Sequence, residues 1–266
     1  MQIRSLGYRT DLIFNRFSGV VADGGDCVVV RTPSNPGYYW GNYLIFRDPP
    51  GDDALPEWKR RFHQEIASRQ PAPHFAFGWD SPAGERGRVE PFLAEGFILN
   101  ENVVLTTDAV SPPPHPNGEV SIRPLTTDGE WAQALENQVA CHAAEFALPA
   151  YRVFKERQMG EYRRMAAAGL GAWFGAFLEG RMVADLGVYV DGPVARFQAV
   201  ETHPDFRRRG ICATLVYEAA HHAQAALGAE RLVMVADEHY HAARIYESLG
   251  FRPTERQLGL ELRPPA

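Results

Sequence analysis

The chain has 266 residues, with 27 Lys and Arg against 33 Asp and Glu, and so carries a formal net charge of −6. Apolar residues make up 45% of it and charged residues 23%, which provides for a sizeable core and excludes general disorder or a coiled-coil rod. The acidic balance disfavours a partner such as nucleic acid or an anionic membrane. The length is typical of about two domains.

The three cysteines, Cys27, Cys141 and Cys212, are far apart and show no CxxC spacing. This pattern predicts neither a disulfide framework nor a zinc site. The paired histidines at 221–222 and 239/241 lack a carboxylate or cysteine at ligand spacing, so we expect no metal. With no signal-like or membrane-spanning apolar run, we expect a cytoplasmic protein that does not contact membranes.

The first half of the chain predicts an alternation of strands and helices. Strands are expected at 26–31, 38–46, 74–79 and 98–106, and helices at 55–68 and 89–95.

Prolines at 112, 113, 114 and 116 interrupt the pattern, and they are incompatible with a helix or a central strand. We therefore predict an N-terminal domain at 1–110, a Pro-rich linker at 111–118 and a second domain at 119–266. The alternative is a long proline-rich surface loop within one domain.

The second half predicts an α/β domain of the α+β type, with a mixed, mostly antiparallel sheet flanked by helices. Turn residues at Glu179-Gly180 and Asp191-Gly192 separate three runs that form an antiparallel meander. The expected strands are 119–125, 172–178, 182–190, 194–202 and 231–236, with one or two more within 251–262, and the expected helices are 128–144, 151–168, 209–227 and 240–249.

The two halves end alike, with Phe92-Leu-Ala-Glu-Gly96-Phe97 in the first and Tyr246-Glu-Ser-Leu-Gly250-Phe251 in the second. Both passages follow a β run. The similarity is explained either by a weak internal duplication or by chance.

The junction between strand 194–202 and helix 209–227 carries the clearest chemistry. Its sequence is Val200-Glu-Thr-His-Pro-Asp-Phe-Arg-Arg-Arg-Gly-Ile-Cys-Ala213. The start of a helix presents unpaired N–H groups and the positive end of the helix dipole, and the arginine triplet adds positive charge for phosphates. Gly210 lets a ligand approach the backbone closely. These features predict an anion site.

The segment Arg207-Arg208-Arg209-Gly210-Ile211-Cys212 resembles the acetyl-CoA loop, [QR]-x-x-G-x-[GA], of the GNAT (Gcn5-related N-acetyltransferase) family. The Ala-rich stretch Ala242–Phe251, with its Tyr and its Gly-Phe, is similar to the family's C-terminal signature. The resemblance covers 119–262 and implies the GNAT acyl-CoA acyltransferase fold. It also implies that the strands 194–202 and 231–236 splay apart to admit a thioester.

The resemblance assigns the cofactor-binding residues. The pantetheine arm is expected on Val200, Glu201 and Thr202, and the pyrophosphate on the loop and first helical turn; the remaining binding residues are Arg207, Arg208, Arg209, Gly210, Ile211, Cys212, Ala213, His239 and Tyr246. Cys212 replaces Gly or Ala of the family pattern, and His239 stands where many members have Asn.

Acyl transfer to an amine requires a neutral amine, a stabilised oxyanion and a proton for the leaving thiolate. A strand N–H, at Val200, would serve the oxyanion. Tyr246 matches the family's general acid, and a purely packing role is the alternative. Glu201 is the candidate base, although strand alternation can turn it away from the thioester, and Met234 stands where some members have Glu. A water chain is an equal candidate for the base.

Two functions follow. The first is an acetyl-CoA-dependent N-acetyltransferase acting on a primary amine of a small molecule or peptide, as a monomer or homodimer. The second is a non-catalytic acyl-CoA-binding or interaction module. The first half is expected to be a degenerate GNAT-like domain that binds no CoA, because acidic residues in Arg47–Asp53 occupy the position of the phosphate loop.

Overall fold

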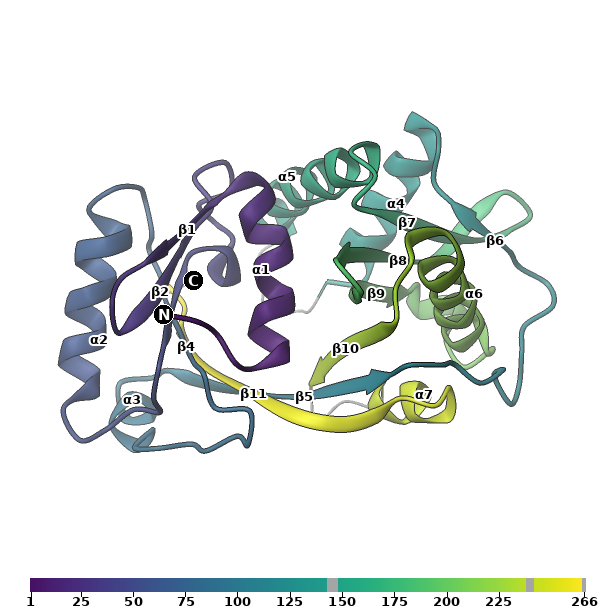
Figure 1. Cartoon of the computed structure of the whole chain (residues 1–266). Helices are drawn as coiled ribbons and strands as arrows, with labels where there is room; N and C mark the ends of the chain where they lie inside the picture. The colour runs from purple at the N-terminus through teal and green to yellow at the C-terminus, as the bar shows by residue number, and fades with distance from the viewer. Residues whose placement is uncertain (143–147, 238–241, 265–266) are drawn as a thin grey trace. The chain divides into compact units, whose positions relative to one another are not determined.

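A computed structural model describes residues 1–142, 148–237 and 242–264 (Figure 1). The chain divides into two units that are discontinuous in sequence. The first contains Met1–Val104, Val235–His239 and Thr254–Ala266, and the second contains Leu105–Met234 and Tyr240–Pro253. None of the helices in the described ranges is long and apolar enough to cross a membrane.

In the first unit the strands lie in the order β1-β2-β3-β4-β11-β5. These strands are β1 (Val20–Asp23), β2 (Cys27–Arg31), β3 (Tyr43–Phe46), β4 (Phe75–Trp79), β11 (Arg252–Leu262) and β5 (Ile98–Thr107). The helices are α1 (Leu6–Ser18), α2 (Ala54–Phe62), which continues as a π-helical turn at His63–Ala67, and α3 (Glu90–Ala94).

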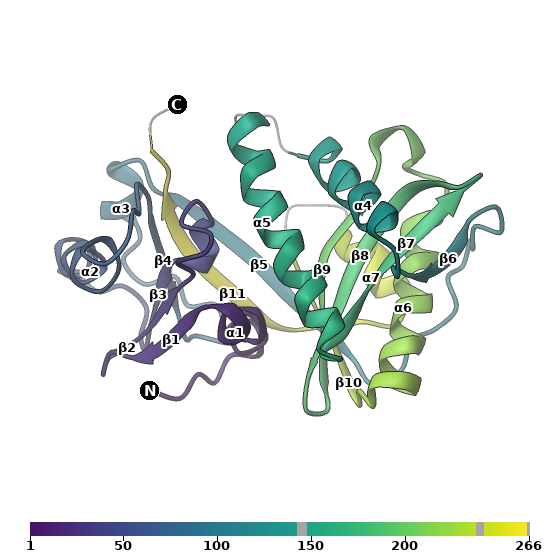
Figure 2. The same cartoon turned by 90° about the horizontal axis from the view of Figure 1, so that it is seen from above.

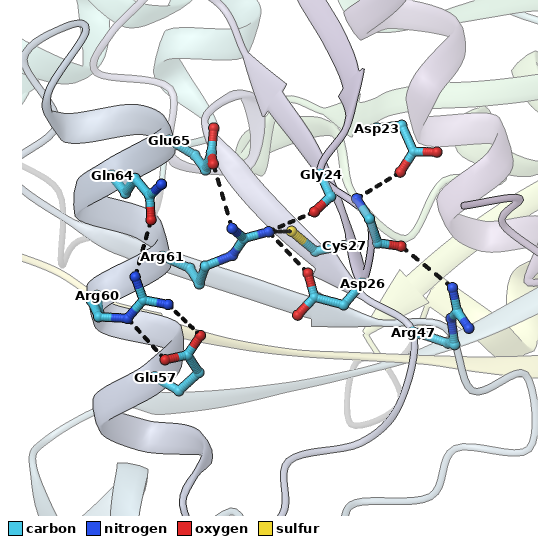
Figure 3. Close-up of polar contacts among 11 residues, drawn as sticks. Asp23, Gly24, Asp26, Cys27, Arg47, Glu57, Arg60, Arg61, Gln64 and Glu65 are labelled. Carbon is cyan, nitrogen blue, oxygen red and sulfur yellow. Dashed lines mark hydrogen bonds and ion pairs between the residues drawn. The ribbon is translucent and has the colours of Figure 1, made fainter.

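Alternate residues of these strands build two cores, one on each face of the sheet. Leu44 and Phe46 of β3 pack with Trp58 and Phe62 of α2, whereas Tyr43 and Ile45 of the same strand pack with α1. Figure 1 accordingly shows α1 and α2 on opposite sides of β1–β4. Arg61 of α2 joins its helix to the β1–β2 turn, since its Nη2 donates to Gly24 O at 2.7 Å and to Asp26 Oδ1 at 2.9 Å (Figure 3).

In the second unit the strands lie in the order β10-β9-β8-β7-β6. They are β10 (Arg231–Asp237), β9 (Val194–Thr202), β8 (Arg181–Asp191), β7 (Gly171–Leu178) and β6 (Ser121–Pro124), and the helices are α4 (Asp128–Ala140), α5 (Leu148–Ala167), α6 (Ile211–Leu227) and α7 (Ala242–Ser248). The predicted antiparallel meander is confirmed as β7-β8-β9. Its helices cover both faces, with α4 and α5 on one and α6 on the other (Figure 2), so all residues from Met182 to Tyr189 are buried.

The N-terminal helix α1 and strand β1 were not predicted, because the expected elements begin only at residue 26. Polar and small residues share the buried face of α1 with apolar ones and hide its periodicity; the buried residues are Gly7, Tyr8, Thr10, Leu12, Ile13 and Asn15. The expected strand at 38–46 begins only at Tyr43, since Tyr39–Gly41 forms a 3-10 turn.

Most of the last strand, from Thr254 on, lies in the first unit, and the expected domain boundaries of 1–110 and 119–266 stay a prediction. Residues Gly259–Leu262 of β11 pair antiparallel with Phe75–Gly78 of β4. Leu258 and Leu260 enter the core beneath α2, and Tyr8 Oη of α1 donates to Leu258 O at 2.5 Å. The sequence predicts this strand correctly, but its pairing partner is set by contacts far away in the chain.

A fragment of residues 117–266 should therefore be less soluble than the full chain and should melt at a lower temperature. Without residues 1–104, β11 loses β4, and the side chains of Leu258 and Leu260, which are 2% and 0% exposed, lose their core. Differential scanning calorimetry and sedimentation of both proteins at equal concentration check this. A fragment as soluble and heat-stable as the full chain would contradict it.

Candidate functional site

The start of α6 has a glycine as its N-cap residue, which supplies no side-chain acceptor for the first backbone N–H groups. Gly210 is the N-cap residue, in the left-handed conformation at φ 74°, and it makes no side-chain cap hydrogen bond. Arg208, two residues earlier, is also left-handed, at φ 61°. N–H groups at a helix start attract anions, and an anion site at this junction stays a prediction.

The three arginines before α6 have different surroundings. Arg207 Nε donates to the carbonyl oxygen of Thr202 at 3.0 Å, and Arg209 Nη2 donates to Glu119 Oε2 at 2.5 Å. Arg208 is exposed, and in the part of the chain that the structure describes its guanidinium has no recorded hydrogen bond or ion pair. Arg208 is thus the cation of the triplet that is most available to a ligand.

Gly210 is required for contact with the protein itself. A Cβ at this position would lie 2.3 Å from the carbonyl oxygen of His115, in the proline-rich segment. That segment is also tied to α6, since Asn117 N donates to Thr214 Oγ1 at 2.9 Å and Asn117 Nδ2 donates to Arg209 O at 2.9 Å. Close approach by a ligand was the expected reason for this glycine; the observed reasons are its positive φ and the packing of residues 115–117.

The ladder between strands β9 and β10 is short. Their parallel pairing runs from Val194↔Arg231 to Arg196↔Val233, and both strands continue beyond it, to Thr202 and Asp237. Further along β9 the register with β8 shifts: Gln198 faces Gly187 and Glu201 faces Asp185, so that Ala199 and Val200 lie opposite Leu186 alone. This is a β-bulge, and Ala199 has φ 47° within it.

Glu201 lies on the face of the sheet that α4 and α5 cover. It is the cross-strand partner of Asp185, and directly opposed residues project to the same face. Burial raises the pKa of the Glu201 carboxyl, and the nearby cations Lys155 and Arg207 partly offset the rise. A carboxyl with a raised pKa accepts a proton more readily near neutral pH, which suits a general base.

A buried polar cluster that was not predicted from the sequence lies beside Glu201. Asp185, which is 0% exposed, accepts from Asn137 Nδ2 at 2.6 Å, from Trp173 Nε1 at 2.7 Å and from Gln138 Nε2 at 3.1 Å. Burial raises the pKa of Asp185 to about 7, against the lowering effect of these three donors. A signal was available, because Asp185 interrupts the apolar strand Met182–Tyr189.

Lys155 completes this cluster from α5. Its side chain is 7% exposed, and Nζ donates to Gln138 Oε1 and to Gln158 Oε1, each at 3.0 Å. Burial lowers the pKa of the ammonium, whereas Glu201, Asp185 and Cys141 act in the opposite direction. Here too a signal was available, since Lys155 is one of only two lysines in the chain.

Tyr246 of α7 is 4% exposed and packs among aromatic rings. Its ring meets that of Phe251 edge-on at 6.3 Å, and Phe251 meets Phe197 of β9 at 6.0 Å. This packing fixes the ring of Tyr246 close to the strand that carries the bulge. His239, the other residue expected from this region, lies outside the described residues.

The cysteines near the junction are poor nucleophiles. Burial raises the pKa of the Cys212 thiol in the first turn of α6 to about 12, and that of Cys141 at the end of α4 to about 12. Cys141 Sγ donates to Thr202 O at 3.5 Å. Within the described ranges, no group of three or more His, Cys, Asp or Glu side chains is arranged to hold a metal ion.

Comparison with known proteins identifies this arrangement. Residues 131–251, which span α4 to the Gly-Phe after α7, match the acetyltransferase (GNAT) family. The matched segment is similar to the acetyltransferase domain of that family. It includes the bulge, the start of α6 and Tyr246, so the expected family resemblance is confirmed. None of the curated proteins matches the chain.

Several solved structures share the fold of nearly the whole chain at low identity. A functionally unknown conserved protein from Staphylococcus epidermidis has a TM-score of 0.72 at 12% identity, over 94% of this chain and 96% of that one. A GCN5-related N-acetyltransferase from Kribbella flavida has a TM-score of 0.65 at 17% identity, over 98% and 97%.

A tandem GNAT protein from the clavulanic acid biosynthesis pathway has a TM-score of 0.57 at 12% identity, over 96% of this chain and 88% of that one. Because the match extends over both units, it supports a tandem GNAT arrangement of the fold, with the GNAT domain in the second half.

In the first unit, the loop at the corresponding position is filled by the protein. Arg88 N donates to Pro50 O at 2.6 Å, and Arg88 Nε lies 3.1 Å from Asp52 Oδ1. A Cβ on Gly87 would lie 2.5 Å from the same Pro50 oxygen. These contacts, together with the acidic residues there, support the proposal that this unit binds no CoA.

Proposed function

We propose that the GNAT domain is an acetyl-CoA-dependent N-acetyltransferase, which moves the acetyl group from the thioester to a primary amine of a small molecule or peptide. The observation that carries the proposal is the bulge in β9, at Ala199 and Val200, which follows the short ladder with β10 and precedes the glycine-capped start of α6. A thioester between the strands would have phosphate-binding N–H groups at one end and an unpaired strand residue at the other.

The binding assignments follow from this placement. Pyrophosphate would accept from the N–H groups around Arg208–Ala213 and from the Arg208 side chain, and the pantetheine arm would lie along Val200–Thr202. Arg207 and Arg209, which already have partners, would chiefly hold the loop and add to its positive field.

The chemical step would use three groups. Glu201, directly or through water, takes a proton from the ammonium of the acceptor, and the neutral amine attacks the thioester carbonyl. The Val200 N–H donates to the oxygen as it becomes an oxyanion. The C–S bond then breaks, and Tyr246 donates its phenol proton to the departing CoA thiolate. The nitrogen of the new amide gives up its extra proton, through water, to the phenolate, which restores the phenol of Tyr246.

A non-catalytic acyl-CoA-binding or interaction module is the second candidate, favoured by the close packing of Tyr246 in the core. Incubating the full chain with acetyl-CoA and a panel of primary amines, and following the release of free CoA, separates the two functions. The enzyme releases CoA only with particular amines, whereas the binding module shows calorimetric affinity without release.

Arg208→Glu should weaken CoA binding about 10- to 100-fold, because a charge-assisted hydrogen bond is replaced by repulsion of the pyrophosphate. Stability should change little, since the side chain is exposed. Arg69→Glu, an equal charge reversal on an exposed arginine of the first unit, is the matched control and should leave affinity unchanged. Isothermal calorimetry with CoA measures both, and equal weakening by the two variants would contradict a specific role for Arg208.

A further inference from the structure

The side chain of Gln138 joins the buried cluster to the backbone of the bulge. It projects from α4, is 1% exposed, and its Nε2 donates to the carbonyl oxygen of Ala199 at 2.9 Å. The other Nε2 hydrogen is directed to Asp185 Oδ2 at 3.1 Å, and Oε1 accepts from Lys155 Nζ at 3.0 Å. The amide is therefore held on three sides by groups from three different elements.

These partners allow only one orientation of the amide. As an ammonium, Lys155 can only donate, and it then faces the oxygen of Gln138. The carbonyl of Ala199 can only accept, so it must face the nitrogen. Rotating the amide by 180° would place oxygen against oxygen at Ala199 and nitrogen against nitrogen at Lys155, and in a buried site such unpaired contacts are costly. Gln138 is thus a fixed donor to the bulge.

The hydrogen bond from Gln138 to the Ala199 carbonyl also orients the next N–H group, that of Val200. The carbonyl of Ala199 and the N–H of Val200 belong to one trans peptide plane, on which they point in opposite directions. Because Gln138 draws the carbonyl toward α4, the Val200 N–H points away from α4. Ala199 is a non-glycine residue at φ 47°, a conformation that persists only where surrounding contacts maintain it.

The same chain of hydrogen bonds polarises that N–H group. Lys155 donates to the Gln138 amide, which donates to the Ala199–Val200 amide, so all donors point the same way along the chain. Hydrogen bonds aligned in this manner strengthen one another in a low-dielectric interior. The chain does not require the Lys155 charge, because a neutral amine still has two hydrogens for its two glutamine acceptors.

We propose that Gln138, held by Lys155 and Asp185, is a positioning residue that aims and polarises the Val200 N–H toward the acyl oxygen. The proposal rests on the proposed function, since it assigns the Val200 N–H to the thioester carbonyl and its oxyanion. Gln138 itself touches neither substrate. Its effect should appear in the chemical step and in the recognition of the acetyl group, and not in the binding of the CoA nucleotide.

Gln138→Glu tests this with a side chain of the same shape, because it keeps an acceptor for Lys155 and replaces the amide donor. We expect kcat to fall about 10- to 100-fold, less than the 10²- to 10³-fold that complete loss of an oxyanion donor costs. The calorimetric affinity and stoichiometry for CoA should not change. The wild type should bind acetyl-CoA about 2- to 10-fold more tightly than CoA, which is the value of one hydrogen bond, and the variant should lose this difference in affinity.

Gln133→Glu is the matched control. Gln133 also lies on α4 and accepts from the backbone of β8, with Met182 N donating to its Oε1 at 2.8 Å, but it does not reach the bulge. We expect wild-type kcat and acetyl preference from it. Gln138→Met, which removes the donor without adding a carboxyl, provides the same readouts if the Glu variant fails to fold. Lys155→Met should lower kcat less than either Gln138 variant.

The outcomes separate this proposal from the proposed function. Suppose that the wild type transfers acetyl groups, and that a folded Gln138 variant has a kcat within twofold of the wild type and still binds acetyl-CoA more tightly than CoA. The positioning role is then wrong, and the proposed acetyltransferase function is unaffected. If the wild type binds acetyl-CoA more tightly than CoA but transfers no acetyl group, the proposed acetyltransferase function is wrong. Loss of that binding preference in the Gln138 variant would then support the positioning role, and its retention would contradict it. A wild type that does not distinguish acetyl-CoA from CoA, or binds neither, overturns the positioning role.

Discussion

Replacing Tyr246 by Phe should lower kcat roughly 10²- to 10⁴-fold, the range for losing a positioned general acid, and should leave acetyl-CoA affinity nearly unchanged. The hydroxyl matters mainly when negative charge builds on the sulfur, so its loss affects the transition state and not the bound substrate. Stability should change little, because Phe keeps the ring and its contact with Phe251. Steady-state and single-turnover rates with acetyl-CoA, together with thermal unfolding, measure the three quantities.

Tyr217→Phe is the control for Tyr246→Phe. Tyr217 lies on α6 of the same unit, where its ring contacts that of His221 at 4.4 Å, and it has no assigned role in catalysis. Its substitution should leave kcat unchanged. If Tyr246→Phe retained wild-type kcat where chemistry limits the rate, water or another residue would have to supply the proton.

Glu201→Gln should lower kcat/KM roughly 10²- to 10⁴-fold, because Gln cannot take the proton of the ammonium. In the wild type kcat/KM should rise with pH through the raised pKa of Glu201, and the variant should lose this limb of the profile. The titratable groups that act on Glu201 or are acted on by it are Lys155, Arg207, Asp185, Cys141, Tyr151 and Cys212. Initial rates from pH 5 to 9 measure the profile.

A stability measurement separates this catalytic role from a structural one. The folded-state pKa of Glu201 lies above its ordinary 4.5, so the stability that its proton supplies is present below that pH and is lost as pH rises through the folded pKa. Asp185, raised to about 7, has the same sign. Glu201→Gln cannot ionise, so at pH 8 it should be at least as stable as the wild type while being much less active.

Glu218→Gln, the same change on an exposed residue of α6, should alter neither property. Chemical denaturation at pH 5 and pH 8 provides the free energies of unfolding. A folded Glu201→Gln variant with an unchanged pH profile would exclude Glu201 as the base, and a variant that is unfolded at pH 8 would contradict the stability prediction.

Local patterns in the sequence were sufficient for most of the second unit. Period-two runs and Gly turns predict β7-β8-β9, and helical spacing predicts α4, α5 and α6, because each of these elements is set by interactions between residues near in the chain. The start of α6 was predicted for the same reason. An arginine triplet followed by glycine at a strand-to-helix junction carries its electrostatic character in a few consecutive residues.

What the tertiary structure decided depends on residues far apart in the chain. β11 pairs with β4 across about 180 positions, and Gly210 meets His115 across about 95, and no local pattern encodes either contact. Likewise, Gln138, Lys155, Asp185 and Ala199 look unrelated in the sequence. They form one hydrogen-bonded chain only because α4, α5, β8 and β9 pack together and leave buried polar groups that must pair with one another.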